Sequence, residues 1–262
     1  MRMDVKIIVA THKAYWMPND NSYLPLHVGS EGKRELGYVG DNTGDNISVL
    51  NSSFCELTGL YWLWKNCDSE YKGVVHYRRY FTSAGLRLTI QQKRNHILTS
   101  KEWSQLLEKA PIVLPKKRNY WIETTRSQYK HAHNPHDLVV TEDLLKEKYP
   151  TYHKSWDKVM NSTKGHRFNM FVMRSDILDE YCEWLFEVLF EIQRRIDISS
   201  YSSYNTRVFG FLSERLLDVW LLTKGYSYVE QDVTYMENQN WIKKGWAFLR
   251  RKILGGVDFE RE

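Results

Sequence analysis

The chain is poor in cysteine, glycine and proline, and each shortage excludes a class of protein. Its 262 residues include three cysteines, Cys55, Cys67 and Cys182, an odd number with no C-x-x-C pair. Such a set does not build a disulfide framework, so buried structural thiols are expected. With only 14 glycines and 6 prolines, collagen-like and low-complexity classes are excluded as well.

Long apolar runs are also missing. No stretch approaches the roughly 18 apolar residues that a membrane span needs. The first apolar run, residues 5–10, is too short and too β-branched for a secretory signal, so we expect a cytoplasmic protein. A hydrophobic content of 42% still provides enough apolar surface for a folded core.

Common nucleotide-binding and metal-binding motifs are absent too. There is no Walker loop and no G-x-G-x-x-G after the first strand, which argues against ATPase and dinucleotide-binding classes. No H-E-x-x-H occurs, and no Asp-x-Asp directly follows an apolar strand. We therefore assign no metal ligand, and dependence on Mn²⁺ or Mg²⁺ stays open.

One local group of side chains could still be interpreted as metal ligands. It consists of His131, His133, His136 and Asp137. The intervening Asn-Pro at 134–135 breaks any regular face between them, so a polar loop or contacts to an acceptor are the favoured alternatives.

Strand-like and helix-like segments alternate along the chain. Strands are expected at residues 5–10, 71–77, 111–115 and 168–173. Helices are expected from Ser53, which has capping-box spacing to Glu56, and at about 101–109, 138–148, 178–196 and 206–222. The alternation predicts an α/β fold with a central, mostly parallel sheet flanked by helices, in a single domain over 1–230.

Basic or donor side chains follow three of these strands. Thr11, His12 and Lys13 follow the first, His76, Arg78 and Arg79 end the second, and Lys116, Lys117 and Arg118 follow the third. Since ligands bind at the carboxyl edge of such sheets, these groups favour a phosphate or diphosphate. The alternative for each cluster is a solvated loop.

Two acidic features invite a functional interpretation. The turn at residues 40–48 carries Asp41, Asp45 and Asn46, which could bind ribose hydroxyls or form a plain Asx-rich turn. Glu214 lies roughly opposite the apolar face of its helix, so it faces either solvent, which we favour on sequence alone, or a cleft.

The end of the chain, residues 231–262, is a basic, aromatic tail. Residues 241–254 combine Trp, Phe, Ile and Leu with five cations. This pattern is typical of a helix that lies on an anionic membrane, and the alternative is a helix docked on the domain.

Six ordered motifs give the chain a family resemblance. They occupy residues 8–13, 40–48, 55–62, 75–81, 169–171 and 210–216, and His-Tyr-Arg-Arg-Tyr at 76–80 is the most specific. Over about residues 5–225 the chain resembles a bacterial family of capsular and exopolysaccharide glycosyltransferases, catalogued as a domain of unknown function. The resemblance implies a GT-A-like fold that binds a nucleotide sugar.

The resemblance also implies an activity. The expected reaction transfers a sugar, galactose in pyranose or furanose form, from a UDP-sugar donor to a lipid-linked glycan at the inner membrane surface. This belongs to capsular polysaccharide, exopolysaccharide or O-antigen biosynthesis.

Site residues follow from that reading as hypotheses. The nucleotide-sugar contacts would be Thr11, His12, Lys13, Asp41, Asp45, Asn46, His76, Arg78, Arg79 and Asn169. His76, Arg78 and Arg79 would neutralise the leaving diphosphate. Glu214 would be the general base, with Arg215 as its partner, and His131 and Asp137 would contact the acceptor.

Two other classes of function compete with this hypothesis. A non-catalytic nucleotide- or glycan-binding component of a polysaccharide assembly complex would also need aromatic side chains and basic strand ends. An RNA-binding protein would use Arg and Tyr to stack on bases, but no recognition motif supports it, and we expect no nucleic-acid partner.

Overall fold

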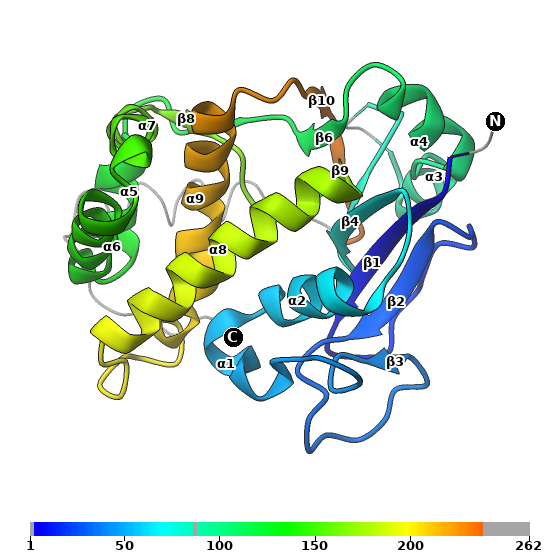
Figure 1. Ribbon diagram of the computed structural model, residues 1–262. Coiled ribbons are helices and arrows are strands. Elements are labelled where there is room, and N and C mark those ends of the chain that lie inside the picture. The colour runs from blue at the N-terminus through cyan, green and yellow to red at the C-terminus, as the bar shows by residue number, and fades with distance from the viewer. Residues whose placement is uncertain (1–2, 86–87, 238–262) are drawn as a thin grey trace.

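A mixed β-sheet forms the centre of the molecule. The computed structural model describes residues 3–85 and 88–237. The strand order is β10-β6-β9-β4-β1-β2-β3, and β5 and β11 form a side ribbon joined to β4 (Figure 1). These strands are β1 (Val5–Thr11), β2 (Tyr23–His27), β3 (Val39–Gly40), β4 (Tyr71–His76), β5 (Arg79–Phe81), β6 (Ile112–Pro115), β9 (Phe171–Arg174), β10 (Val229–Gln231) and β11 (Val233–Tyr235).

The sequence of β1 explains its central position. Ile7, Ile8 and Val9 are fully buried, as expected for a strand covered on both faces. β1 pairs in parallel with β4 on one side and β2 on the other. β9 lies antiparallel between β4 and β6 and interrupts the parallel order. The predicted α/β class with a central, mostly parallel sheet is confirmed.

Helices cover both faces of the sheet. Ile8 and Val74 share one apolar cluster with α2 (Leu57–Asn66), α8 (Ser175–Arg195) and α9 (Val208–Lys224), while Ile7 packs on the side of α4 (Ser100–Leu107). Next to α4 lies α3 (Ile90–Asn95). A further group packs against α8 and α9, away from the sheet (Figure 1). It comprises α5 (Thr125–Ala132), α6 (Pro135–Lys148) and α7 (Pro150–Met160).

The remaining elements are short. They are the helices η1 (Ser48–Leu50), α1 (Asn51–Phe54) and η2 (Asn205–Arg207), and the two-stranded ribbon of β7 (Arg118–Asn119) and β8 (Lys164–Gly165). In the part of the chain that the structure describes, no helix has the length and apolarity to cross a membrane. Residues 241–254, expected to form an amphipathic helix, lie outside the described residues, whereas the start of the expected tail at 231–262 belongs to the sheet and contains β11.

The structure corrects two expected element boundaries. The helix expected to run on from Ser53 ends at Phe54, and α2 begins at Leu57, because Cys55 adopts φ 53° and ψ −130°. The Ser53 hydroxyl donates to the Leu50 carbonyl oxygen and caps neither helix. The strand expected from residue 168 begins only at Phe171.

Candidate active site

A cleft of about 880 Å³ lies at the carboxyl ends of β1 and β4. Among the described residues, seven Lys or Arg side chains and two carboxylates line it. The cations are Lys33, Arg78, Arg79, Arg118, Arg167, Arg207 and Arg215, and the carboxylates are Glu56 and Glu214. Such a wall concentrates positive potential inside a concave surface and favours an anionic ligand.

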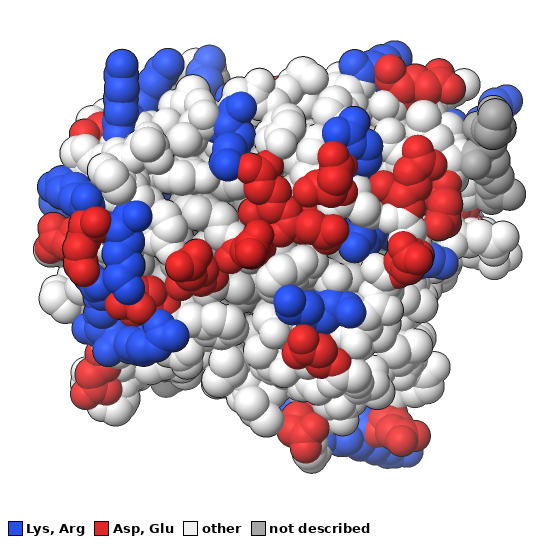
Figure 2. Space-filling view, viewed as in Figure 1, with Lys and Arg blue, Asp and Glu red and all other residues white. Residues whose placement is uncertain are grey.

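The positive charge of the cleft contrasts with the acidic side chains along α8. Figure 2 shows a band of acidic side chains along the line of α8, whose exposed residues include Asp176, Asp179, Glu183 and Glu187. The net charge of +5 is therefore unevenly distributed.

The pKa of His12 reflects burial and the positive charge of the cleft. This pKa is lowered below the ordinary value, first by burial and then by Arg78, Lys13 and Lys33. A neutral imidazole surrounded by cations can donate a hydrogen bond to an anion without adding to the repulsion between them.

The β4–β5 turn supplies His76, Arg78 and Arg79. The His76 Nε2 atom lies 2.5 Å from the Phe168 carbonyl oxygen, so this nitrogen carries the proton. Burial lowers the pKa of His76, which favours the neutral imidazole. The Arg79 guanidinium stacks over the Phe168 ring at 4.5 Å, and Arg78 is partly exposed beside Glu237.

Glu214 faces the cleft, which is the second of the two alternatives left by the sequence. Its Oε1 atom accepts from the Phe168 N–H at 2.9 Å, and its Oε2 atom accepts from Arg215 at 2.9 Å. The side chain remains 19% exposed. A carboxylate held in this way keeps lone pairs for a further proton donor.

The segment before β9 fixes both carboxylates of the cleft. Phe168 and Asn169 have φ angles of 82° and 49°, in the left-handed region. The Asn169 amide donates to Glu56 Oε1 at 2.7 Å and to the Gly210 carbonyl oxygen at 3.0 Å. Asn169 is buried and outside the described lining, and in this structure its amide positions Glu56. Sequence reasoning missed Glu56 because its spacing from Ser53 suggested a cap.

A buried histidine anchors the same segment to α9. His166 is 1% exposed, its Nδ1 atom lies 2.5 Å from Asp218 Oδ1, and its backbone N–H donates to Asp218 Oδ2 at 2.9 Å. Asp218 lies one helical turn after Glu214. The candidate base and the turn that holds it are thus attached to one helix.

Asp41 lies away from the described lining, fully buried under β2 and η1. Its two oxygens accept from the Gly29 and Ser30 N–H groups and from the hydroxyls of Ser30, Ser48 and Thr58. These five donors occupy the carboxylate, so in this structure it braces the loop.

Four further predicted nucleotide contacts, described next, also lie outside the lining that the structure describes. Thr11 is buried and its hydroxyl donates to the Lys13 carbonyl oxygen at 2.6 Å. Lys13 lies over the Tyr77 ring, while Asp45 and Asn46 form an exposed turn beside Asn66.

Neither of the two predicted acceptor residues lines the described cleft, and each pairs with different partners. His131 is 68% exposed and pairs with Glu123 at 2.7 Å. Asp137 is buried and accepts from the hydroxyls of Tyr129 and Tyr201. Of this local group, His133 is the member whose ring lines the cleft, and the group does not converge as a set of metal ligands.

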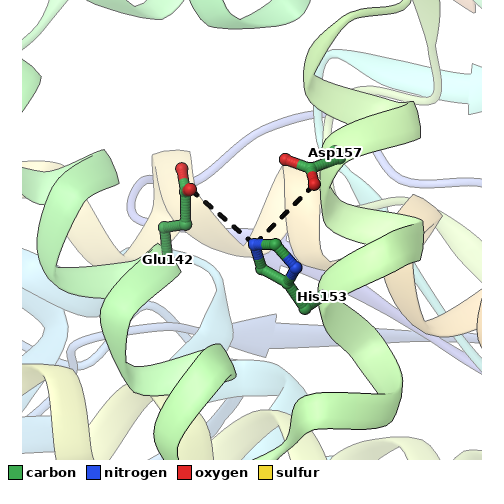
Figure 3. Close-up of side chains that lie close together, drawn as sticks. All are labelled: Glu142, His153 and Asp157. Atoms are coloured by element: carbon green, nitrogen blue, oxygen red, sulfur yellow. Dashed lines mark ion pairs between the residues drawn. The ribbon is translucent and has the colours of Figure 1, made fainter.

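One group of described residues has the composition of a metal site. Glu142, His153 and Asp157, on α6 and α7, offer ligand atoms that lie within 4.8 Å of one another (Figure 3). Arg126 already pairs with both carboxylates, and Lys146 pairs with Glu142. None of the three lines the cleft, whose nitrogen-rich wall fits a diphosphate better than a divalent cation.

Fold and cleft together define an α/β protein with a cationic, carboxylate-bearing site at the carboxyl edge of its sheet. Residues 6–225 match the family described as "Domain of unknown function (DUF4422)", and the chain belongs to this family. The family has no stated activity.

A solved structure provides the functional comparison. The apo structure of WbbM, described as a bifunctional glycosyltransferase, is similar to this chain with a TM-score of 0.81 and 29% identity. The match covers 89% of this chain and 45% of WbbM, so the chain spans about half of that protein. No curated protein matches the chain. The expected likeness to a glycosyltransferase is supported, whereas His-Tyr-Arg-Arg-Tyr as a family signature stays a prediction.

Proposed function

We propose that this protein is a glycosyltransferase that moves a sugar from a UDP-sugar to a glycan acceptor. The observation that carries the proposal is Glu214, a carboxylate fixed by Phe168 and Arg215 inside a cleft lined by seven cations. Similarity to a bifunctional glycosyltransferase supports the class of reaction.

The cationic wall would bind the donor. Arg78 and Arg79 would contact the diphosphate, with neutral His12 and His76 beside them. Fixed guanidinium groups stabilise the charge that develops on a departing phosphate oxygen. In this proposal the guanidinium groups take the part that a metal ion plays in many such sites, and no step is assigned to a metal ion.

Glu214 would act as the general base. The acceptor hydroxyl oxygen attacks the anomeric carbon, and its proton passes to the Glu214 carboxylate. The bond between that carbon and the diphosphate oxygen breaks, and the leaving UDP takes the electron pair. A single displacement of this kind inverts the anomeric centre.

The finer parts of the proposal rest on the sequence motifs. They are galactose as the transferred sugar, a lipid-linked acceptor, and a role in capsular polysaccharide, exopolysaccharide or O-antigen biosynthesis. Contact with the inner membrane surface would involve residues 241–254 of the basic tail, beyond the described residues.

The test compares Glu214→Gln with wild-type protein on UDP-galactose in the absence of acceptor. We expect slow donor hydrolysis in the wild type and a loss of about 100-fold or more in the variant, because water also needs the base. UDP should raise the melting temperature of both equally. Glu183→Gln, an exposed substitution on α8, is the matched control and should retain full activity.

One outcome would contradict this function, and another would contradict the role of Glu214. A protein that is stabilised by UDP but turns over none of a panel of UDP-sugars would be a binding component rather than an enzyme. Unchanged hydrolysis in Glu214→Gln would place the base elsewhere, and Glu56 would be the next residue to test.

A further inference from the structure

Three aromatic rings form one wall of the cleft. The His133 ring stacks on Phe211 at 4.0 Å between centroids and on Tyr204 at 5.6 Å, with interplanar angles of 29° and 14°. Tyr204 and Phe211 also touch, at 5.3 Å. All three side chains line the cleft, and Tyr204 is 43% exposed. We call this group the aromatic wall.

The aromatic wall is built by segments that are distant in sequence. His133 is the C-cap that follows α5, Tyr204 lies in the connection between α8 and α9, and Phe211 lies on α9. A hydrogen bond anchors this connection, because the Tyr201 hydroxyl donates to buried Asp137 at 2.6 Å. Asp137 thereby holds the wall in place without reaching the cleft.

The aromatic wall adjoins the candidate base. Phe211 precedes Glu214 by three residues on α9, a spacing that puts two side chains on the same helix face. The Phe211 carbonyl oxygen accepts from Arg215, which also binds Glu214. A ligand lying on the wall would therefore present its groups to Glu214.

The chemistry of the wall suits a sugar ring. One face of a pyranose exposes C–H groups that pack on an aromatic ring, while its hydroxyls need donors and acceptors. Arg207 lies over the Phe211 ring at 5.5 Å and also lines the cleft, so its guanidinium can meet those hydroxyls. The diphosphate-binding arginines come from a different element, the β4–β5 turn.

We propose that Tyr204, His133 and Phe211 form the subsite for the acceptor sugar, a pyranose that stacks on Tyr204 with one hydroxyl directed at Glu214. This inference rests on the proposed glycosyltransferase function and adds the place and chemical class of the acceptor. The competing occupant is the uracil ring of the donor, which would stack on the same surface.

The test uses UDP-galactose as donor and a series of octyl pyranosides, gluco, galacto and N-acetylglucosaminyl, as acceptors. Tyr204→Ala should raise the KM of the accepted pyranoside about tenfold, as expected for the loss of one stacking contact. Hydrolysis of UDP-galactose without acceptor, and its donor KM, should stay within twofold of wild type. Tyr204→Phe keeps the ring and should behave as wild type.

Several outcomes would overturn the inference. A higher KM for UDP-galactose with an unchanged acceptor KM would assign the wall to the uracil ring, and unchanged values for both would show that Tyr204 meets neither. A wild-type enzyme that hydrolyses UDP-galactose but transfers to none of the pyranosides would reject a pyranose acceptor. Absence of any donor hydrolysis would instead count against the proposed function. Because Tyr204 is partly exposed, its truncation leaves the core intact.

Discussion

Asp41 illustrates why the role of a single buried side chain is hard to predict from sequence alone. Its place in an acidic turn suggested ribose binding, and its burial depends on donors from Ser30, Ser48 and Thr58. Those donors become neighbours only once β2, η1 and α2 have packed together. Local composition therefore identified Asp41 as a polar side chain, whereas its hydrogen-bond donors could be identified only in the folded structure.

Replacement of Asp41 by Asn tests this structural role. The amide NH₂ would face N–H and O–H donors, so we expect the free energy of unfolding to fall by about 3 kcal/mol in urea titrations. Asp45→Asn, an exposed change four residues on, should stay within about 0.5 kcal/mol of wild type. Equal losses in the two variants would contradict a special role for Asp41.

At the scale of elements, periodicity predicted the central strand and the long helices but missed β2, α5 and α7, which are regular as well. The buried strand β1 and the amphipathic helices α8 and α9 follow from their apolar spacing alone. Prediction failed at Cys55 and at the turn before β9, where the chain enters the left-handed region. Glu56 directly follows Cys55, and its carboxylate accepts from Asn169 in the turn before β9. Because both segments are irregular, periodicity could not indicate that Glu56 lines the cleft.

The break between α1 and α2 can be tested through its backbone angles. The φ and ψ of Cys55 are far easier for glycine than for a residue with a Cβ atom. We expect Cys55→Gly to be more stable than Cys55→Ala by about 1 kcal/mol. Cys67, at the end of α2, is the control, since its extended angles (φ −113°, ψ 134°) should make alanine the better substitute. Both pairs can be compared by urea unfolding, and an alanine preference at Cys55 would contradict the argument.

At the scale of the whole molecule, the site was partly predictable because strand ends converge. His12, His76, Arg78 and Arg79 meet in the cleft as the α/β edge rule implies, and α9 adds Glu214. Arg118 was also expected at this edge. Arg167 and Arg207, together with the rings of Tyr204 and Phe211, were not assigned. They come from loops, from η2 and from α9, whose packing against distant elements leaves no signature in local sequence.

Three histidines make the free energy of unfolding depend on pH. Burial lowers the pKa of His12, His27 and His76, whereas in the unfolded chain each titrates near 6.5. Below about pH 6.5 the unfolded chain therefore binds more protons than the folded one, and the free energy of unfolding must fall as the pH drops. Stability from these groups is complete above that pH.

Urea unfolding at pH 7.5, 6.5 and 5.5 and constant ionic strength measures the effect, in a range where most carboxylates stay ionised in both states. We expect a progressive loss between pH 6.5 and 5.5. His76→Gln keeps a donor for the Phe168 carbonyl oxygen but cannot titrate, so its pH slope should be shallower than that of wild type even if its stability at pH 7.5 is lower. Equal slopes for the two proteins would mean that His76 takes up its proton equally in the folded and unfolded chains, and the lowered pKa of the imidazole beside the proposed diphosphate site would have to be abandoned.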